Sequence, residues 1–115
     1  MANVSLDSAM RTAVLAKDEL HYPPDITDMS SMSFVGKDMS KIAKDKVMKH
    51  TDFSDADLSG ADFKGFNLQG CIFRRTILNG TNFANADLRW SIIEQVETDE
   101  ASNFDGADLR EVVRN

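Results

Sequence analysis

The chain has 115 residues, of which 42% are hydrophobic, and this suits one small domain with a modest core rather than two domains. Its net charge of -6 arises in residues 51–115, where twelve acidic side chains face six basic ones, whereas residues 1–50 carry seven of each. The acidic charge argues against phosphate contacts by residues 51–115. The sequence shows neither an apolar run of membrane-spanning length nor the pattern of a secretory signal. Cys71 has no second cysteine with which to form a disulfide.

The first predicted element is an amphipathic helix over residues 5–20. Ser5 is a residue type that caps helices, and Pro23 and Pro24 follow the end of the segment. The apolar stripe of this helix comprises Leu6, Met10, Ala13, Val14 and Leu20. An isolated helix of this length is marginally stable. We therefore expect residues 1–26, the helix and a Pro-containing connector, to dock on the same chain or on another one.

Residues 27–50 allow two interpretations. The stretches TDMSS, MSFVG and KDMSK fit five-residue units centred on Met29, Phe34 and Met39. Lys37 would then point inward, which is unfavourable for a lysine, and a short helix over residues 37–49 is the alternative. We expect degenerate repeats followed by a basic helix or loop. Its lysines form a solvated face or bind an acidic partner.

Residues 51–95 consist of nine five-residue units in unbroken register. The central position of every unit is large and apolar, and the position two residues earlier is small in eight units of nine. In an extended segment these two side chains point to the same side. Glycines such as Gly60 and Gly65 follow where a turn needs positive φ. A chain that bends every five residues has to coil.

These A-(D/N)-L-x-x units resemble those of pentapeptide repeat proteins, and the pattern returns in "SNFDGADLRE" at residues 102–111. The resemblance implies a β fold, a right-handed quadrilateral β-helix with four units per coil. We expect residues 51–115 to form this β-helix, with a corner insertion near 94–101. About three to four coils would stack at roughly the β-strand spacing of 4.8 Å.

Four units per coil place residues twenty positions apart in one column. Phe53 and Phe73 then share one side, and Phe63 and Phe83 share the opposite side. The predicted core ladder is Phe53, Leu58, Phe63, Leu68, Phe73, Leu78, Phe83, Leu88, Ile93, Phe104 and Leu109. Phe66, at a normally small position, either fills space in this core or swings outward.

Several apolar residues stand where the repeat normally presents Asp or Asn to solvent, or at the adjoining corner. A soluble solenoid has no reason to expose an apolar column, so either the chain covers it or a partner does. The candidate partner surface consists of Ile72, Ile77, Trp90, Ile92 and Val113.

The sequence offers no catalytic arrangement, cofactor motif or metal cluster. His21 and His50 lie outside the regular units, and Cys71 takes a small inward position where packing explains it. We therefore expect no catalytic residues, no cofactor and no metal, and a protein that is not an enzyme.

Three functions remain, and the first is a non-enzymatic interaction or scaffold module that binds a protein partner or itself. The second is a structural component of a larger assembly, such as a phage particle or a secretion-linked complex. The third is a DNA mimic that binds DNA gyrase, a function that the resemblance suggests. The length of the chain disfavours it, because a B-DNA turn of about 34 Å matches roughly seven coils, or about 140 residues. We expect no direct binding of nucleic acid, no membrane span, and a bacterial cytoplasmic location, or the host cell if a phage encodes the chain.

Overall fold

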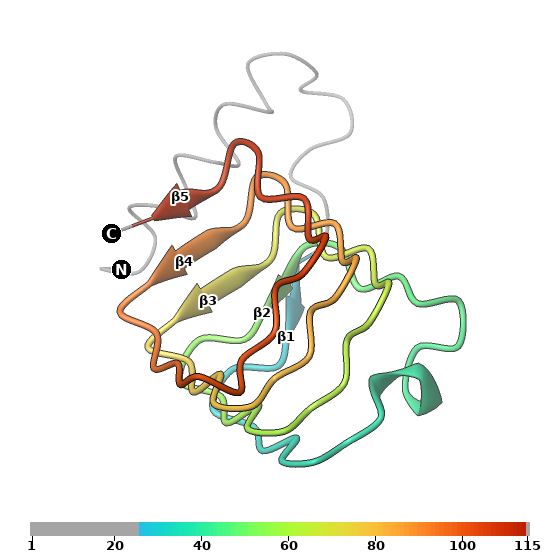
Figure 1. Cartoon of the computed structure of the whole chain (residues 1–115), viewed down its shortest axis with the longest axis vertical. Coiled ribbons are helices and arrows are strands. Elements are labelled where there is room, and N and C mark those ends of the chain that lie inside the picture. The colour runs from blue at the N-terminus through green and yellow to red at the C-terminus, as the bar shows by residue number, and fades with distance from the viewer. Residues whose placement is uncertain (1–25, 115) are drawn as a thin grey trace.

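The computed structural model describes residues 26–114, which wind into a coil of parallel strands (Figure 1). Each strand pairs with the strand one coil later, so the order in the sheet is β1-β2-β3-β4-β5. The strands are β1 (Thr27–Asp28), β2 (Thr51–Asp52), β3 (Ile72–Arg74), β4 (Ile92–Glu94) and β5 (Val113–Arg114). Figure 1 shows the strands stacked along the molecule from blue β1 to red β5. The predicted parallel β fold is confirmed, and the amino-terminal helix lies outside the described residues.

The other three sides of each coil are held by single parallel bridges. In the middle of the molecule these are Asp57↔Ile77, Asp62↔Asn82 and Asn67↔Asp87, each joining residues twenty positions apart. Together with the sheet they give a four-sided solenoid with four five-residue units per middle coil. The right-handed sense of the coil stays an expectation from the resemblance.

The first and last coils are longer than the middle ones. Thr27 pairs with Thr51, 24 positions away, because the chain leaves the coil after Asp38 to form η2 (Met39–Lys41), a single 3-10 turn, and returns at Val47. In the last coil, Ile77 pairs with Glu97 but Asn82 pairs with Asn103, so one extra residue lies between Glu97 and Asn103. Residues 27–38 keep the register of the repeats through bridges such as Ser33↔Asp57.

Every corner of the middle coils contains a residue in the left-handed region. Gly60, Gly65 and Gly80 have φ values of 69°, 70° and 69°, as a glycine at this turn position predicts. Asp55 and Arg75 take the same conformation at φ 62° and 55°. This conformation costs a non-glycine residue about 1–2 kcal/mol, which hydrogen bonds between stacked coils offset. One such bond runs from the Asp55 N–H to the carbonyl of Arg74, one coil on, at 2.8 Å.

Where a unit has an outward Asp or Asn, that side chain caps the corner that follows it. The Asp57 Oδ1, for example, accepts the backbone N–H of Ser59 at 3.0 Å, and Asn82 does the same for Ala84. This is an Asx turn, in which a short polar side chain satisfies a backbone donor two residues ahead. Further caps are formed by Asp28, Asp38, Asp52, Asp62, Asn67, Asp87, Asn103 and Asp108. The Asp or Asn of the repeat therefore has a structural role besides facing solvent.

Stacked phenylalanine rings fill the core between columns of leucine. Phe53 stacks on Phe73 with ring centroids 5.5 Å apart, and Phe63 stacks on Phe83 at 5.4 Å. The predicted ladder is at most 1% exposed at Phe53, Leu58, Phe63, Leu68, Phe73, Leu78, Phe83 and Leu88. Towards the last coil, by contrast, Ile93 and Phe104 are only half-buried and Leu109 is 39% exposed.

The second inward position of each unit is small, and its hydroxyl groups are satisfied inside the core. Thr76 donates to the carbonyl of Phe53 at 2.8 Å, and Thr81 donates to the carbonyl of Leu58 at 2.7 Å. Buried hydroxyls with such partners cost little free energy. Phe66 takes this position in its own unit, is 1% exposed and packs edge-on against Phe63. Of its two predicted placements, the structure shows the inward one.

Replacing Phe63 by Ala should lower the free energy of unfolding by about 3–5 kcal/mol, because a fully buried ring is removed from both a stacked and an edge-on contact. Leu109 belongs to the same ladder but is 39% exposed, so replacing it by Ala should lower the free energy of unfolding by about a third of this amount or less. Urea denaturation followed by circular dichroism measures both. Equal losses would contradict the described gradient of burial.

Candidate interaction surface

Two of the three isoleucines of the predicted partner surface are buried. Ile72 on β3 pairs with Ile92 on β4, and Ile92 pairs with Val113 on β5, so the three residues form the expected column. Ile72 and Ile92 are only 2% and 0% exposed, however, whereas Val113 is 43% exposed. Of the two alternatives for this column, cover by the chain or cover by a partner, the burial of Ile72 and Ile92 agrees with the first. Burial of two large aliphatic side chains is what the hydrophobic effect favours.

Ile77 and Trp90 lie elsewhere on the solenoid. Ile77 bridges Asp57 and Glu97 on the next side of the coil and is half-buried. Trp90 stands at the corner that leads into β4 and is 48% exposed. The structure therefore places two strongly exposed members of the predicted surface, Trp90 and Val113, near the last two strands. A partner for this surface stays a prediction.

Trp90 adopts a backbone conformation that a bulky aromatic residue rarely takes. Its φ is 62°, and Gly70, at the same corner one coil earlier, has a φ of 71°. A non-glycine, bulky residue in the left-handed region is an outlier that requires support from its surroundings. The guanidinium carbon of Arg89 lies 5.2 Å from the centroid of the Trp90 ring, a cation–π contact. The chain thus holds an exposed indole at a corner where glycine would adopt the backbone conformation at a lower cost in free energy.

Ion pairs fix the charged side chains beside Trp90. Arg89 donates to Asp87 at 2.7 Å and also lies 3.7 Å from Asp108, which accepts from Arg110 at 2.6 Å. The hydrogen bond from Arg110 lowers the pKa of Asp108 to about 2, and the hydrogen bond to Asp87 raises the pKa of Arg89. Exposed pairs of this kind add little stability each, but a linked network orders the side chains. We call Arg89, Trp90, Arg110 and Val113 the Trp90 corner.

The two arginines of the Trp90 corner were not among the residues predicted from the sequence. Each ends an "ADLR" stretch, at residues 86–89 and 107–110, and each arginine lies two positions after an aspartate. In the structure this spacing lets the Asp87 and Asp108 carboxylates accept both the backbone and the guanidinium of the arginine that follows. The repeated stretch was the signal that could have identified Arg89 and Arg110 before the structure.

Two further reactive side chains, Cys71 and His50, have pKa values that their surroundings shift. Burial raises the pKa of Cys71 to about 12, so its thiol stays protonated, and its Sγ donates to the carbonyl of Met48 at 3.0 Å. Burial and the charge of Lys49 lower the pKa of His50, whose ring lies over Gly70. In this described part of the chain no group of three or more His, Cys, Asp or Glu side chains could hold a metal ion. The same residues include no helix long and apolar enough to span a membrane.

Comparison with known proteins identifies the repeats. Residues 56–95 match the family model for pentapeptide repeats, with eight copies. No curated protein matches the chain.

Several solved structures are also similar to the chain. One is HetL from Nostoc sp. strain PCC 7120, a pentapeptide repeat protein involved in heterocyst differentiation regulation, at 20% identity and TM-score 0.38, with 76% of this chain and 38% of that chain covered. Another is the pentapeptide repeat protein Rfr23 from Cyanothece 51142, at 17% identity and TM-score 0.33, with 78% and 82% covered. A third is trypsin-treated QnrB1, a plasmid-mediated fluoroquinolone resistance protein, at 18% identity and TM-score 0.27, with 76% and 47% covered.

Folding stability should fall as the pH drops from about 4 towards 2, because hydrogen bonds lower the pKa values of several corner-capping aspartates in the folded state. For Asp108, whose pKa falls from 3.8 to about 2, the stabilisation is present above pH 3.8 and is lost as the pH falls through about 2. Urea midpoints at several pH values measure this. Asp108→Asn keeps the capping oxygen without the titration and should show a smaller loss. A rise in stability on acidification would contradict the capping role.

Proposed function

We propose that this chain, whose residues 56–95 are pentapeptide repeats, is a non-enzymatic interaction module that presents the Trp90 corner to a protein partner. The observation that supports this most is Trp90 itself, an indole 48% exposed and held at φ 62°. Every corner of the middle coils takes this conformation, so the large exposed aromatic ring is what distinguishes the corner at Trp90 from the others.

The chemistry of the Trp90 corner suits protein binding. Tryptophan and arginine are among the residue types most enriched where a few side chains dominate the binding energy of a protein interface. Here Arg89 lies against the indole and is also tied to Asp87, so both side chains are ordered before a partner arrives. Ordered side chains lose less conformational entropy on binding, which favours affinity. Val113, 43% exposed on β5, extends the same surface with an apolar contact.

The rest of the molecule supports a scaffold rather than an enzyme. The Cys71 thiol is buried with a raised pKa, and Asp87 and Asp108 near the Trp90 corner are engaged with arginines instead of being poised to exchange protons. The proposed module needs no cofactor, and we place it in the bacterial cytoplasm, or in the host cell if a phage encodes it.

A role in a larger assembly is a second candidate, and the apolar residues exposed at the solenoid ends favour it.

Mimicry of DNA at DNA gyrase has less support. Four spacings separate the five stacked strands, and at about 4.8 Å each they give roughly 19 Å, little more than half of the B-DNA turn of about 34 Å. The lysines of the first coil also break the acidity that such mimicry requires.

Replacing Trp90 by Gly should separate binding from folding. The substitution relieves the left-handed strain, so the free energy of unfolding should stay unchanged or rise by about 1 kcal/mol. Affinity for the partner, identified by affinity capture with the wild-type chain and then measured with purified protein, should fall about thirtyfold or more, as for an interface hot spot.

Gln95→Gly is the matched control. Gln95 is also a left-handed corner residue, with φ 54°, but it carries no aromatic ring and lies at the other end of β4. This control should gain similar stability and keep partner binding. Equal binding by the wild-type chain and the Trp90→Gly variant would overturn the proposed role of the Trp90 corner.

A further inference from the structure

Exposed apolar side chains gather at the two ends of the solenoid. The structure exposes seven large hydrophobic side chains among the described residues, and Trp90 is the one that lies in a middle coil. The other six belong to the first coil or the last coil and are Met32, Val35, Ile42, Val47, Leu109 and Val113. An apolar surface of this kind marks a contact site on a soluble protein.

The open face of the last coil is a shallow apolar pocket of about 440 Å³. Phe104 stacks on Phe83 below it, with centroids 5.1 Å apart, but no described coil follows to cover the other face of the Phe104 ring. The pocket is lined by Ile93, Gln95, Val96, Thr98, Phe104, Leu109 and Arg114. In the middle coils the backbone N–H of each central residue donates to a carbonyl one coil on; the N–H of Phe83, for example, donates to the carbonyl of Asn103 at 2.7 Å. The last coil therefore offers both an apolar layer and a strand edge.

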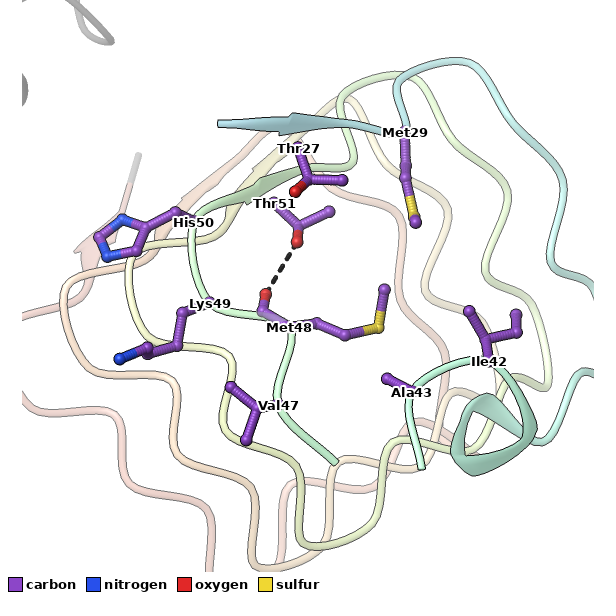
Figure 2. Close-up of a pocket in the computed structure, with 9 residues that line it drawn as sticks. All are labelled: Thr27, Met29, Ile42, Ala43, Val47, Met48, Lys49, His50 and Thr51. Carbon is purple, nitrogen blue, oxygen red and sulfur yellow. Dashed lines mark hydrogen bonds between the residues drawn. The ribbon is translucent and has the colours of Figure 1, made fainter. Parts of the chain in front are cut away.

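The first coil has a matching opening, of about 350 Å³, at the other end of the solenoid. Figure 2 shows the side chains of Met29 and Met48 directed into this space, and Ile42 and Ala43, which follow η2, lie at its edge. Ile42 and Val47 are 47% and 40% exposed here. Flexible methionine side chains adapt to the shape of an apolar partner.

The two ends carry opposite charge. Residues 26–50, which form the first coil, contain five lysines and three aspartates, a net charge of +2. Residues 94–114, which form the last coil, contain seven acidic side chains and two arginines, a net charge of -5. Two last coils facing each other would repel, and so would two first coils, whereas a last coil facing a first coil is attractive.

We infer that this chain associates with itself head to tail, with the acidic last coil of one copy seated on the basic first coil of the next. In this arrangement the exposed Ile42 and Val47 and the half-buried Met29 of the first coil cover Phe104 and Leu109, and the parallel stacking of the coils continues. Such a contact uses two different surfaces and does not close on itself, so it produces open chains of copies. The inference goes beyond the proposed function and does not depend on the Trp90 side chain.

Sedimentation velocity of the full chain across protein concentrations tests the association. The weight-average mass should rise steadily with concentration beyond that of a dimer. Raising the salt from about 0.01 M to about 0.3 M should weaken association about fivefold or more, because the charges at the two ends are exposed and screened. A monomer at every concentration overturns the inference, and a species that stops at a dimer overturns the open arrangement.

Two variants with one altered end each test the direction of the contact. Leu109→Asp and Ile42→Asp each place a carboxylate in an apolar layer of the contact, where its desolvation is costly. In Ile42→Asp the new charge also faces an acidic last coil. Each variant alone should be monomeric. An equimolar mixture should form a dimer and nothing larger, because it contains one intact end of each kind and its two altered ends repel each other.

Other results distinguish the competing arrangements. If Ile42→Asp still dimerises while Leu109→Asp does not, the contact is between two last coils, and if the reverse holds it is between two first coils; either result overturns head-to-tail association. Deletion of residues 1–25 tests whether this segment, rather than a second copy of the chain, occupies the opening of the first coil. If the chain associates only after the deletion, the segment binds there and the inference is wrong for the full chain. Circular dichroism checks that each variant is folded. Trp90→Gly should associate like the wild-type chain, so failure of one proposal is separable from failure of the other.

Discussion

The left-handed residue at every fifth position is the constraint on which the rest of this structure depends. It turns the chain through a corner after each short extended piece, so that one large and one small side chain of every unit point inward. Glycine takes this conformation at Gly60, Gly65 and Gly80, and at Gly60 and Gly65 the capping oxygen of an Asp in the same unit stabilises the turn. The five-residue period follows from the corner rather than from any preference of the strands, which are two or three residues long.

No coil buries a core alone, so stability comes from neighbouring coils. The stacked rings of Phe53 and Phe73 and the carbonyl partners of Thr76 and Thr81 all lie one coil apart. A stacked structure of this kind has a well-packed middle and two incomplete ends. The half-buried Phe104 and the exposed Leu109 are the physical expression of an incomplete end, and they show why apolar surface collects there.

The sequence predicted the inward pattern well, because large apolar residues spaced five apart fit neither a helix nor a flat strand. It did not predict how deeply each side chain is buried, since exposure depends on what lies beyond a single coil. Ile72 and Ile92 were correctly placed in one column but are buried, and Leu109 belongs to the ladder but is exposed. The Trp90 conformation was also out of reach, because the sequence shows a corner position but not which corners tolerate strain. The capping bonds of the aspartates could have been predicted from the preference of Asp and Asn for Asx turns.

Amide hydrogen exchange at low protein concentration tests most directly whether stability derives from stacking between neighbours. Stacking predicts the slowest exchange at core amides of the middle coils, such as those of Leu58, Phe63 and Leu78, which donate to the next coil at 2.7–2.9 Å. Exchange should become faster towards both the first coil and the last coil. Uniform protection along residues 26–114, or slowest exchange in the last coil, would contradict stacking as the source of stability.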